Sequence, residues 1–383
     1  YSADTNGHIN VTLPEGEVVL AYGFSPDMPG AVQTDLTVQA RSGSLNWTAP
    51  NPKWKAAVFT KCTIEDPNDV VYGVDYLDAE AMRFFFDFTL TPYEQALGKY
   101  FGNVIKGIFT DEPTLLPWHH NGMWYAQRDH VRLIPWNDAV SQDIKSLHNL
   151  SIDEFLPHLF YNIDSATGHM RKLYQKSVTD LYLRSFFNPY KAWCQKHSLK
   201  LTGHLLLEEG LYYNTIFESD PFPILSALDI PGTDHLGDAT EHEYTGIPNL
   251  PIEHTNIHGR KLASSVSHLI GSNTTISECY GCAGWGLTLD RAKVIADWQY
   301  SLGINMLCPH AMFYSIEGFR KHDAPPAHNY LPNWKHYKKF SDYIGRISYA
   351  LRQGTHKARV ALYYPIGAFH SAYSPLYSEG EAR

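Results

Sequence analysis

Two glutamates, Glu112 and Glu278, each follow an apolar run that has the pattern of a buried strand. Glu112 ends the run in VIKGIFTDEP, and Glu278 lies in TTISECYG. A carboxyl group among apolar and aromatic residues has to be paired, hydrogen-bonded or functional. Two facing carboxyl groups can cleave a glycosidic bond, because one protonates the leaving oxygen while the other activates water or attacks as nucleophile. We predict that Glu112 and Glu278 form this catalytic pair.

The surroundings of the two carboxyl groups decide how such a pair works. Their pKa values must differ, so that one group starts protonated and the other ionised. A separation of about 6.5–9.5 Å is typical of inverting enzymes, and about 5–5.5 Å of retaining ones. Pro113 is expected to hold Glu112 in an extended conformation, which suits a strand end. For Glu278 the alternative interpretation is a buried salt bridge to an arginine such as Arg291.

Other polar side chains follow the neighbouring apolar runs. His204 and Glu208 lie four residues apart in GHLLLEE, and Asp234 and His235 end LDIPGTDH. We predict that these four side chains contact sugar hydroxyls or a cation and that Glu209 points elsewhere. The alternative is a polar cluster at the rim whose hydrogen bonds are satisfied internally. The remaining residues that we predict to contact substrate are Asp111, Trp285 and His310.

Strands must bring these residues to one edge of a sheet. Five apolar segments occur in order, and helical patterns lie between them. Alternating strands and helices are typical of a parallel sheet or barrel, whose active site lies at the carboxyl ends of the strands. We predict a (β/α)8 TIM-type barrel that carries insertions, is incomplete at its N-terminus and is followed by the start of a β-containing domain. The five segments are VIKGIFT as the fourth strand, LKLTGHLL, LDIPGTDH, TTISECYG as the seventh and INMLCPHAMF.

Three regions are expected along the chain. Residues 1–55 form a β-rich N-terminal segment, residues 56–352 the barrel, and residues 353–383 the start of a following domain. That last region is expected to open with a strand, KARVALYYP. The first barrel strands would lie within residues 1–75 or partly before residue 1. Residues 115–165 are too long for a simple loop and predict an insertion over the active-site face.

Capping signals mark several helices. Asp78 is expected to cap a helix that continues to about Lys99, and Thr288 and Gly303 are expected to bound another. A longer helix is predicted over residues 167–197, with an interruption at Pro189.

Composition excludes several classes of partner. The 383 residues are 44% hydrophobic and 19% charged, as in ordinary globular proteins. A net charge of -9 and the lack of a Lys/Arg cluster argue against nucleic acid. No apolar run has the length of a membrane span. Phe, Trp and Tyr make up 14% of the chain, which indicates either a large aromatic core or a carbohydrate cleft.

Other signals bear on location and on competing chemistry. Asn-x-Ser/Thr triplets, together with the acidic and aromatic-rich composition, favour a secreted protein, although no signal peptide is visible. Motifs of phosphate-binding loops, dinucleotide folds, zinc proteases and serine hydrolases are missing. The four triplets begin at Asn10, Asn46, Asn149 and Asn273.

Three long segments resemble the catalytic domain of glycoside hydrolase family 106, which contains α-L-rhamnosidase-like enzymes. They are VDYLDAEAMRFFFDFTLTPYEQALGKYFGNVIKGIFTDEP, WCQKHSLKLTGHLLLEE and SECYGCAGWGLTLDRAKVIADWQYSLGINMLCPHAMFYS. The resemblance implies a (β/α)8 barrel, an inverting mechanism and often a calcium ion in the sugar site. Carried over by motif, Glu112 is similar to the general acid and Glu278 to the general base. Glu208 and Asp234 carry oxygens suitable for calcium.

We therefore expect an exo-acting glycoside hydrolase that removes a terminal sugar, α-L-rhamnose first among the candidates. Its substrate would be a polysaccharide, an oligosaccharide or a glycoconjugate. One alternative keeps the barrel but acts with retention on another sugar, such as a β-galactoside. Another alternative is a carbohydrate-binding protein without catalysis. Fold analogy alone does not separate these three possibilities.

Overall fold

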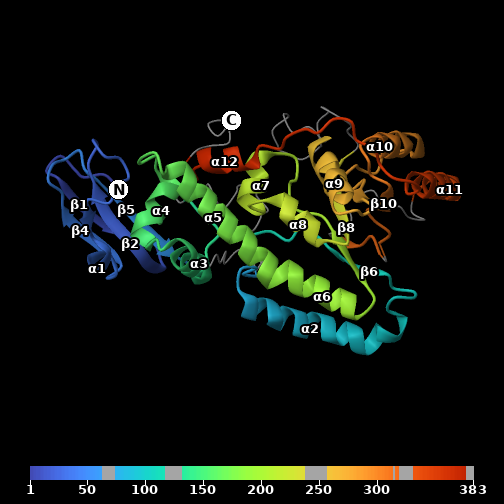
Figure 1. The fold of residues 1–383 in the computed structure, drawn as a ribbon, viewed down its shortest axis with the longest axis horizontal. Helices are drawn as coiled ribbons and strands as arrows, with labels where there is room; N and C mark the ends of the chain where they lie inside the picture. Colours follow the sequence, from blue (N-terminus) through green and yellow to red (C-terminus); the bar gives the residue numbers. More distant parts are fainter. Residues whose placement is uncertain (63–73, 117–131, 238–256, 314, 319–330, 377–383) are drawn as a thin grey trace.

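Five parallel strands form the sheet that carries the predicted site residues (Figure 1). The computed structural model describes residues 1–62, 74–116, 132–237, 257–313, 315–318 and 331–376. The sheet order is β10-β9-β8-β7-β6, so neighbours in sequence are neighbours in space. The sheet curls into a half-barrel, and a complete eight-stranded ring remains a prediction. The strands are β6 (Gly107–Thr110), β7 (Lys200–Gly203), β8 (Ile230–His235), β9 (Ile276–Cys279) and β10 (Met306–Pro309).

Two glycines allow these strands to lie close together. A side chain at Gly203 would overlap the carbonyl oxygen of Thr110 on β6, and one at Gly232 would overlap the carbonyl oxygen of Gly203. Gly203 also has a φ of +142°, which residues with a Cβ rarely adopt. The register then places Asp234 of β8 directly beside Glu278 of β9. Two of the predicted residues are therefore neighbours on one face of the sheet.

Helices lie between the strands of this sheet, as the alternating pattern predicted. The capping prediction for α10 is confirmed, because Thr288 accepts a hydrogen bond from the N–H of Arg291. Gly303, with a φ of +100°, follows the end of the same helix. The helices between β7 and β10 are α7 (Leu211–Phe217), α8 (Pro221–Ala227), α9 (Ile257–Leu269) and α10 (Leu289–Ser301), and α11 (Trp334–Leu351) follows β10.

The longest predicted helix has an internal irregularity near Pro189. It consists of α5 (Thr167–Tyr182), a π-helical turn (Leu183–Phe187) and α6 (Asn188–Lys196). Proline lacks an N–H donor and clashes with the preceding turn, so a wider turn before it is a common solution. Helix α2 (Ala79–Leu97), followed by a short turn, η1 (Gly98–Tyr100), lies beside α6 (Figure 1). Asp78 caps α2 as predicted.

The N-terminal residues form two small antiparallel sheets rather than the first barrel strands. The sheets are β1 paired with β4, and β3-β2-β5. Strand β5 overlaps the segment expected to begin the barrel, yet it pairs with β2. In the described part of residues 1–75 the prediction of parallel barrel strands is therefore wrong. The elements are β1 (His8–Thr12), β2 (Glu17–Phe24), β3 (Thr34–Asp35), α1 (Thr37–Ala40), β4 (Ser44–Thr48) and β5 (Lys55–Lys61).

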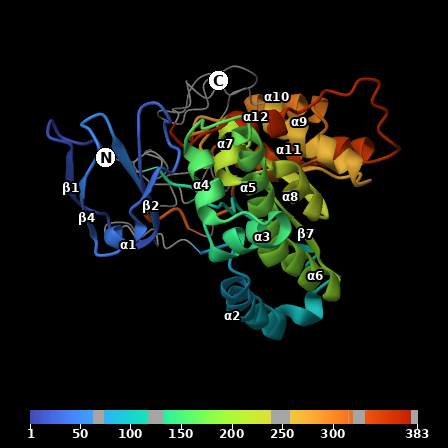
Figure 2. The same cartoon turned by 60° about the vertical axis from the view of Figure 1, so that its left-hand side comes forward.

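The described part of the predicted insertion is helical. Helices α3 (Asp138–His148) and α4 (Ile152–Phe160) pack against α5 and lie beside the N-terminal strands (Figure 2). Lys61 of β5 joins the two parts, because its amino group is 2.9 Å from Asp138 and 2.8 Å from Glu17. The insertion exists, but its described helices do not form the predicted cover over the strand ends. Residues 117–131 lie outside the described residues.

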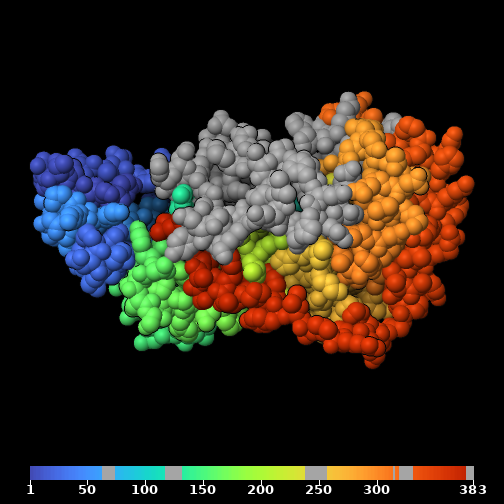
Figure 3. Space-filling view, turned by 90° about the horizontal axis from the view of Figure 1, so that it is seen from above, coloured from blue at the N-terminus to red at the C-terminus, as the bar shows by residue number. Residues whose placement is uncertain are grey.

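The C-terminal segment is a helix, so the predicted strand over residues 357–365 is wrong. Residues 357–365 form no strand. The side chain of Leu362, in the middle of this segment, is 95% exposed. Instead α12 (Ile366–Ala372) packs against α5, where Arg171 donates to the carbonyl of Ala372 at 2.9 Å. Figure 3 shows this red segment against the green helices. No helix in the described residues combines the length and apolarity of a bilayer-spanning segment.

Candidate active site

A buried histidine, His204, lies at the centre of the predicted residues. It follows β7 directly and is 1% exposed. Its Nε2 atom is 3.0 Å from Glu278 Oε2 and 3.3 Å from Asp111 Oδ1, and its Nδ1 is 3.2 Å from the carbonyl of Leu205. Burial disfavours a charged ring, but the hydrogen bonds with Asp111 and Glu278 outweigh burial and raise the pKa of His204 well above its ordinary value. His204 is therefore an imidazolium in neutral solution.

Glu112 comes to the same histidine from β6. Oxygen atoms of Glu112 and Asp234 and a ring nitrogen of His204 lie within 4.8 Å of one another. Burial raises the pKa of Glu112 to about 8, Asp234 adds to the shift, and His204 opposes it. The backbone φ of Glu112 is +44°, so the expected extended conformation before Pro113 is wrong. Such strain in a residue other than glycine is costly and is concentrated at functional sites.

The second predicted acid, Glu278, also contacts His204. Ligand atoms of Asp111, His204 and Glu278 also lie within 4.8 Å of one another. Glu112 and Glu278, 166 positions apart in the sequence, thus converge on one imidazole ring. The cation next to Glu278 is this histidine, at 3.0 Å, rather than the arginine considered as its partner. The two carboxyl groups have different surroundings. Burial raises the pKa of Glu112, whereas Glu278 lies 3.0 Å from the ring of His204.

Glu208 directs its two carboxylate oxygens to neighbouring residues of the protein. One of its carboxylate oxygens accepts the N–H of Leu205 at 2.7 Å, and the other accepts the hydroxyl of Thr233. Burial raises the pKa of Glu208 to about 7, although His204 opposes the shift. Both oxygens are used to join the end of β7 to β8. Glu208 therefore braces the end of β7 against β8, and its contact with substrate stays a prediction.

The adjacent Asp234 does point at the centre, and His235 does not. Burial raises the pKa of Asp234 to about 7, His204 opposes the shift, and Glu278 adds to it. Successive side chains of a strand point to opposite faces. His235 accordingly contacts Arg260 at 2.9 Å and the ring of Trp298 on the helix side. The structure separates this predicted pair.

Two further predicted residues, His310 and Trp285, differ in whether they contact the carboxyl groups. The Nε2 atom of His310, after β10, is 4.0 Å from Glu278 Oε1. Trp285 is 45% exposed on the loop after β9, and no described contact joins it to the carboxyl groups. Glu209 was expected to point elsewhere, but its Oε1 atom is 3.7 Å from Arg260 at the edge of the site. Arg260 was not predicted, because nothing in the sequence of α9 links it to the strand ends.

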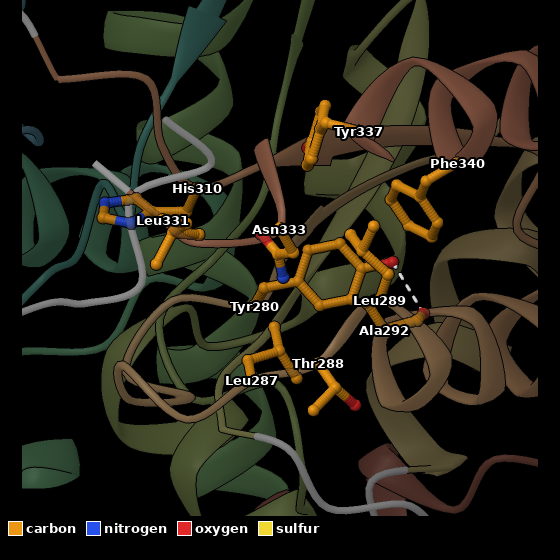
Figure 4. Close-up of a pocket in the computed structure, with 10 residues that line it drawn as sticks. All are labelled: Tyr280, Leu287, Thr288, Leu289, Ala292, His310, Leu331, Asn333, Tyr337 and Phe340. Carbon is orange, nitrogen blue, oxygen red and sulfur yellow. Dashed lines mark hydrogen bonds between the residues drawn. The ribbon is translucent and has the colours of Figure 1, made fainter. Parts of the chain in front are cut away.

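A small apolar cavity lies on the far side of His310 (Figure 4). Its volume of about 20 Å³ holds a water molecule but not a sugar ring. Tyr280 crosses it and donates a hydrogen bond to the carbonyl of Ala292 at 3.0 Å. This cavity belongs to the packing between β9, α10 and α11 and is not the sugar site. Its lining residues include Leu287, Leu289, Leu331, Tyr337 and Phe340.

The described residues do not fit the calcium ion that the family resemblance implied. The two groups of possible ligands are Glu112–His204–Asp234 and Asp111–His204–Glu278, and both include an imidazole nitrogen. Calcium takes six to eight oxygen ligands and has little affinity for nitrogen. Each oxygen of Glu208, one of the two residues considered for calcium, accepts a hydrogen bond from within the protein.

The start of α9 lies close under the site because residue 259 is glycine. A Cβ atom there would be 3.0 Å from Glu208 Cβ, Glu208 Oε2 and Thr233 Oγ1. We expect Gly259→Ala to destabilise the fold by about 1–3 kcal/mol, since over-packing of this kind displaces its neighbours. Urea unfolding measures the change.

Gly345→Ala is the matched control for this substitution. Gly345 lies within α11 and has no atom near its Cβ position. Alanine there should stabilise the helix by about 0.5–1 kcal/mol. If Gly259→Ala stabilised the protein as much as Gly345→Ala, the close approach of α9 to Glu208 would be contradicted.

Comparisons with known proteins support the fold. No protein-family model matches the chain. A Formosa agariphila protein named "Putative beta-glucuronidase" is 22% identical over 339 residues, which are 84% of this chain and 26% of that protein. The solved rhamnosidase from Novosphingobium sp. PP1Y superposes with a TM-score of 0.57 and 19% identity, over 84% of this chain and 30% of the rhamnosidase. The chain shares its fold with that rhamnosidase.

Both comparisons agree with the expected resemblance to glycoside hydrolases, without singling out family 106. The chain spans less than a third of either similar protein. All four Asn-x-Ser/Thr asparagines are exposed, and secretion stays a prediction.

Proposed function

We propose that this chain carries the catalytic site of a glycoside hydrolase that removes a terminal sugar. The observation that supports it most is the convergence of Glu112 and Glu278 on His204 in two different electrostatic surroundings. Glycosidases need one protonated and one ionised carboxyl group, flanking the scissile bond. The similarity to a rhamnosidase and to a protein named for glucuronidase activity agrees with this reaction class.

In this mechanism Glu112 is the general acid. Its pKa of about 8 keeps it protonated in neutral solution. It donates that proton to the glycosidic oxygen as the bond from this oxygen to the anomeric carbon breaks. The leaving group departs as an alcohol, and positive charge develops on the sugar ring. Proton donation of this kind contributes about 10²–10⁴-fold to the rate.

Glu278 is the general base. A water molecule attacks the anomeric carbon from the opposite face while Glu278 accepts one of its protons. The product is a free sugar with inverted configuration, and a proton returns from Glu278 to Glu112 through solvent. The His204 imidazolium, 3.0 Å from Glu278 and 3.3 Å from Asp111, orients both carboxylates and balances their charge. His204 is therefore a positioning residue.

The charge of the site favours a neutral sugar. Among the described residues around His204, the basic side chains in contact with the acids are Arg260, His310 and His204 itself. Burying a sugar carboxylate among a larger number of acids costs free energy through repulsion and desolvation. We propose α-L-rhamnose, which has no ionisable group, ahead of a glucuronide. The surrounding carboxyl groups belong to Asp111, Glu112, Glu208, Glu209, Asp234 and Glu278, and the raised pKa of Glu112 leaves that group uncharged in neutral solution.

Hydrolysis of p-nitrophenyl glycosides tests this assignment. We expect release of nitrophenol from the α-L-rhamnoside and a rate at least tenfold lower on the β-D-glucuronide and β-D-galactoside. NMR of the first-formed anomer should show inversion. Preferred cleavage of the glucuronide would contradict the neutral-sugar assignment, and a retained anomer would make Glu278 a nucleophile. Sugar binding without any hydrolysis would favour a binding protein.

A further inference from the structure

Arg260, in the first turn of α9, is fully buried at the rim of the site. One terminal nitrogen donates to His235 Nδ1 at 2.9 Å. The other is 3.7 Å from Glu209 Oε1, which is too long for a hydrogen bond. This nitrogen and Nε have no hydrogen-bond partner among the described residues. A buried guanidinium thus keeps two donor atoms unused.

Two acceptors close to Arg260 are also unused. Glu209 Oε2, on the loop after β7, and Asp234 Oδ1, on β8, are buried and have no hydrogen-bond partner in the described part of the chain. Each of these acids acts electrostatically on Arg260. Native proteins satisfy most buried polar atoms, because an unsatisfied one costs about 1–3 kcal/mol. Unused donors and acceptors that come together from three elements indicate a place built for a polar ligand.

The chemistry of the three side chains selects the ligand. An anion would be repelled by Glu209 and Asp234, and a cation by Arg260. A hydroxyl group both donates and accepts hydrogen bonds, so it can donate one to a carboxylate and accept one from the guanidinium. Two adjacent hydroxyls would use the free donors and acceptors together.

We propose that Arg260, Glu209 and Asp234 form a subsite that binds hydroxyl groups of the terminal sugar. This inference rests on the proposed function and adds the residues that recognise the sugar. Asp234 joins the subsite to the reaction centre, because its carboxylate lies within 4.8 Å of Glu112 and His204. His235 and the ring of Trp298, 6.0 Å from the guanidinium carbon, hold Arg260 in place. His235 thus positions Arg260 from the helix side of β8.

The test compares wild type and Glu209→Gln on the aryl glycoside and on its 2-, 3- and 4-deoxy analogues. Loss of one charge-assisted hydrogen bond should lower kcat/KM of the parent glycoside about 10- to 100-fold, mainly through KM. On the deoxy analogue that lacks the bound hydroxyl, the variant and wild type should differ less than threefold. Equal losses on every analogue, or no loss on the parent, would overturn the subsite.

A second substitution and a control separate recognition from folding. Arg260→Lys keeps the charge but removes the planar donor set, and it should show the same dependence on the deoxy analogues. Glu218→Gln is the control, because Glu218 is fully buried and burial raises the pKa of its carboxyl group well above the ordinary value. It should leave kcat/KM unchanged. Melting temperatures show whether each variant is folded.

Calorimetry with methyl α-L-rhamnoside distinguishes failure of the subsite from failure of the proposed reaction. If wild type does not hydrolyse glycosides but binds this sugar more tightly than Glu209→Gln by tenfold or more, the subsite stands without the catalytic proposal. If wild type hydrolyses the rhamnoside and Glu209→Gln binds the sugar equally well, the subsite is wrong and the reaction stands.

Discussion

Glu112→Gln and Glu278→Gln are each expected to lower kcat by about 10²–10⁴-fold on glycosides with poor leaving groups, because general acid and base catalysis contributes that much. Glutamine matches glutamate in shape, so sugar affinity should change less than tenfold. The measurement is steady-state hydrolysis together with calorimetric binding of the sugar. Glu80→Gln, an exposed change on α2, is the control and should leave both quantities unchanged.

The pH dependence identifies which glutamate is the acid. Glu112 is active in its protonated form, and its pKa is about 8. Wild-type kcat/KM should therefore fall as the pH rises through about 8. In Glu112→Gln this alkaline limb should disappear, because glutamine does not titrate. Retained turnover of glycosides with poor leaving groups in either glutamine variant, or an unchanged alkaline limb in Glu112→Gln, would contradict the assignment.

His204→Gln is expected to have the next largest effect, a loss of about 10²-fold or more in kcat, because misplacing a catalytic group by about 1 Å has that effect. Glutamine can keep one donor near Glu278 and Asp111 but removes the positive charge. The carboxylates then repel one another. The acid limb of the kcat/KM profile, which reports the base, should move to higher pH, and the protein should also melt at a lower temperature.

His370→Gln is the matched control for His204. His370 is also buried and donates through Nε2, to the carbonyl of Ser219 at 2.8 Å. Burial lowers the pKa of His370 to about 4, so it is neutral and carries no charge to lose. This variant should melt lower without any change in the pH profile. An unchanged acid limb in His204→Gln would show that His204 has only a structural role.

The sequence predicted the five strands of the sheet and the residues at their ends well, because apolar runs followed by acids are local signals. It predicted that Glu112, His204, Asp234 and Glu278 lie near one another, and the structure brings them together. Helix caps at Asp78 and Thr288 were also found from local sequence. Local patterns therefore established half of a barrel and the centre of its site.

Three features could not be read from local patterns. The antiparallel pairing of β5 depends on β2, a partner more than 30 residues away. The place of Arg260 depends on how α9 docks, which needs the glycine at 259. The direction of His235 depends on which face of β8 is turned inward, and a strand buried on both faces gives no alternation from which to decide. Each feature is set by tertiary contacts.

The exposed segment before α12 also shows that local sequence does not decide strand formation. KARVALYYP has the composition of a strand, yet no neighbouring strand is present in the described residues to complete its hydrogen bonds. Strand propensity depends strongly on such neighbours. The chain after α11 is therefore extended and then helical, and α12 is held by α5.

The most direct test of the two-carboxylate mechanism is the dependence of hydrolysis on the leaving group in Glu112→Gln and Glu278→Gln. An acidic phenol departs without protonation, whereas an alkyl alcohol needs a proton from the general acid. We predict that Glu112→Gln cleaves 2,4-dinitrophenyl α-L-rhamnoside within tenfold of wild type but loses alkyl rhamnosides, while Glu278→Gln loses both. Equal rates of the two variants on both substrates would contradict the roles assigned to Glu112 and Glu278.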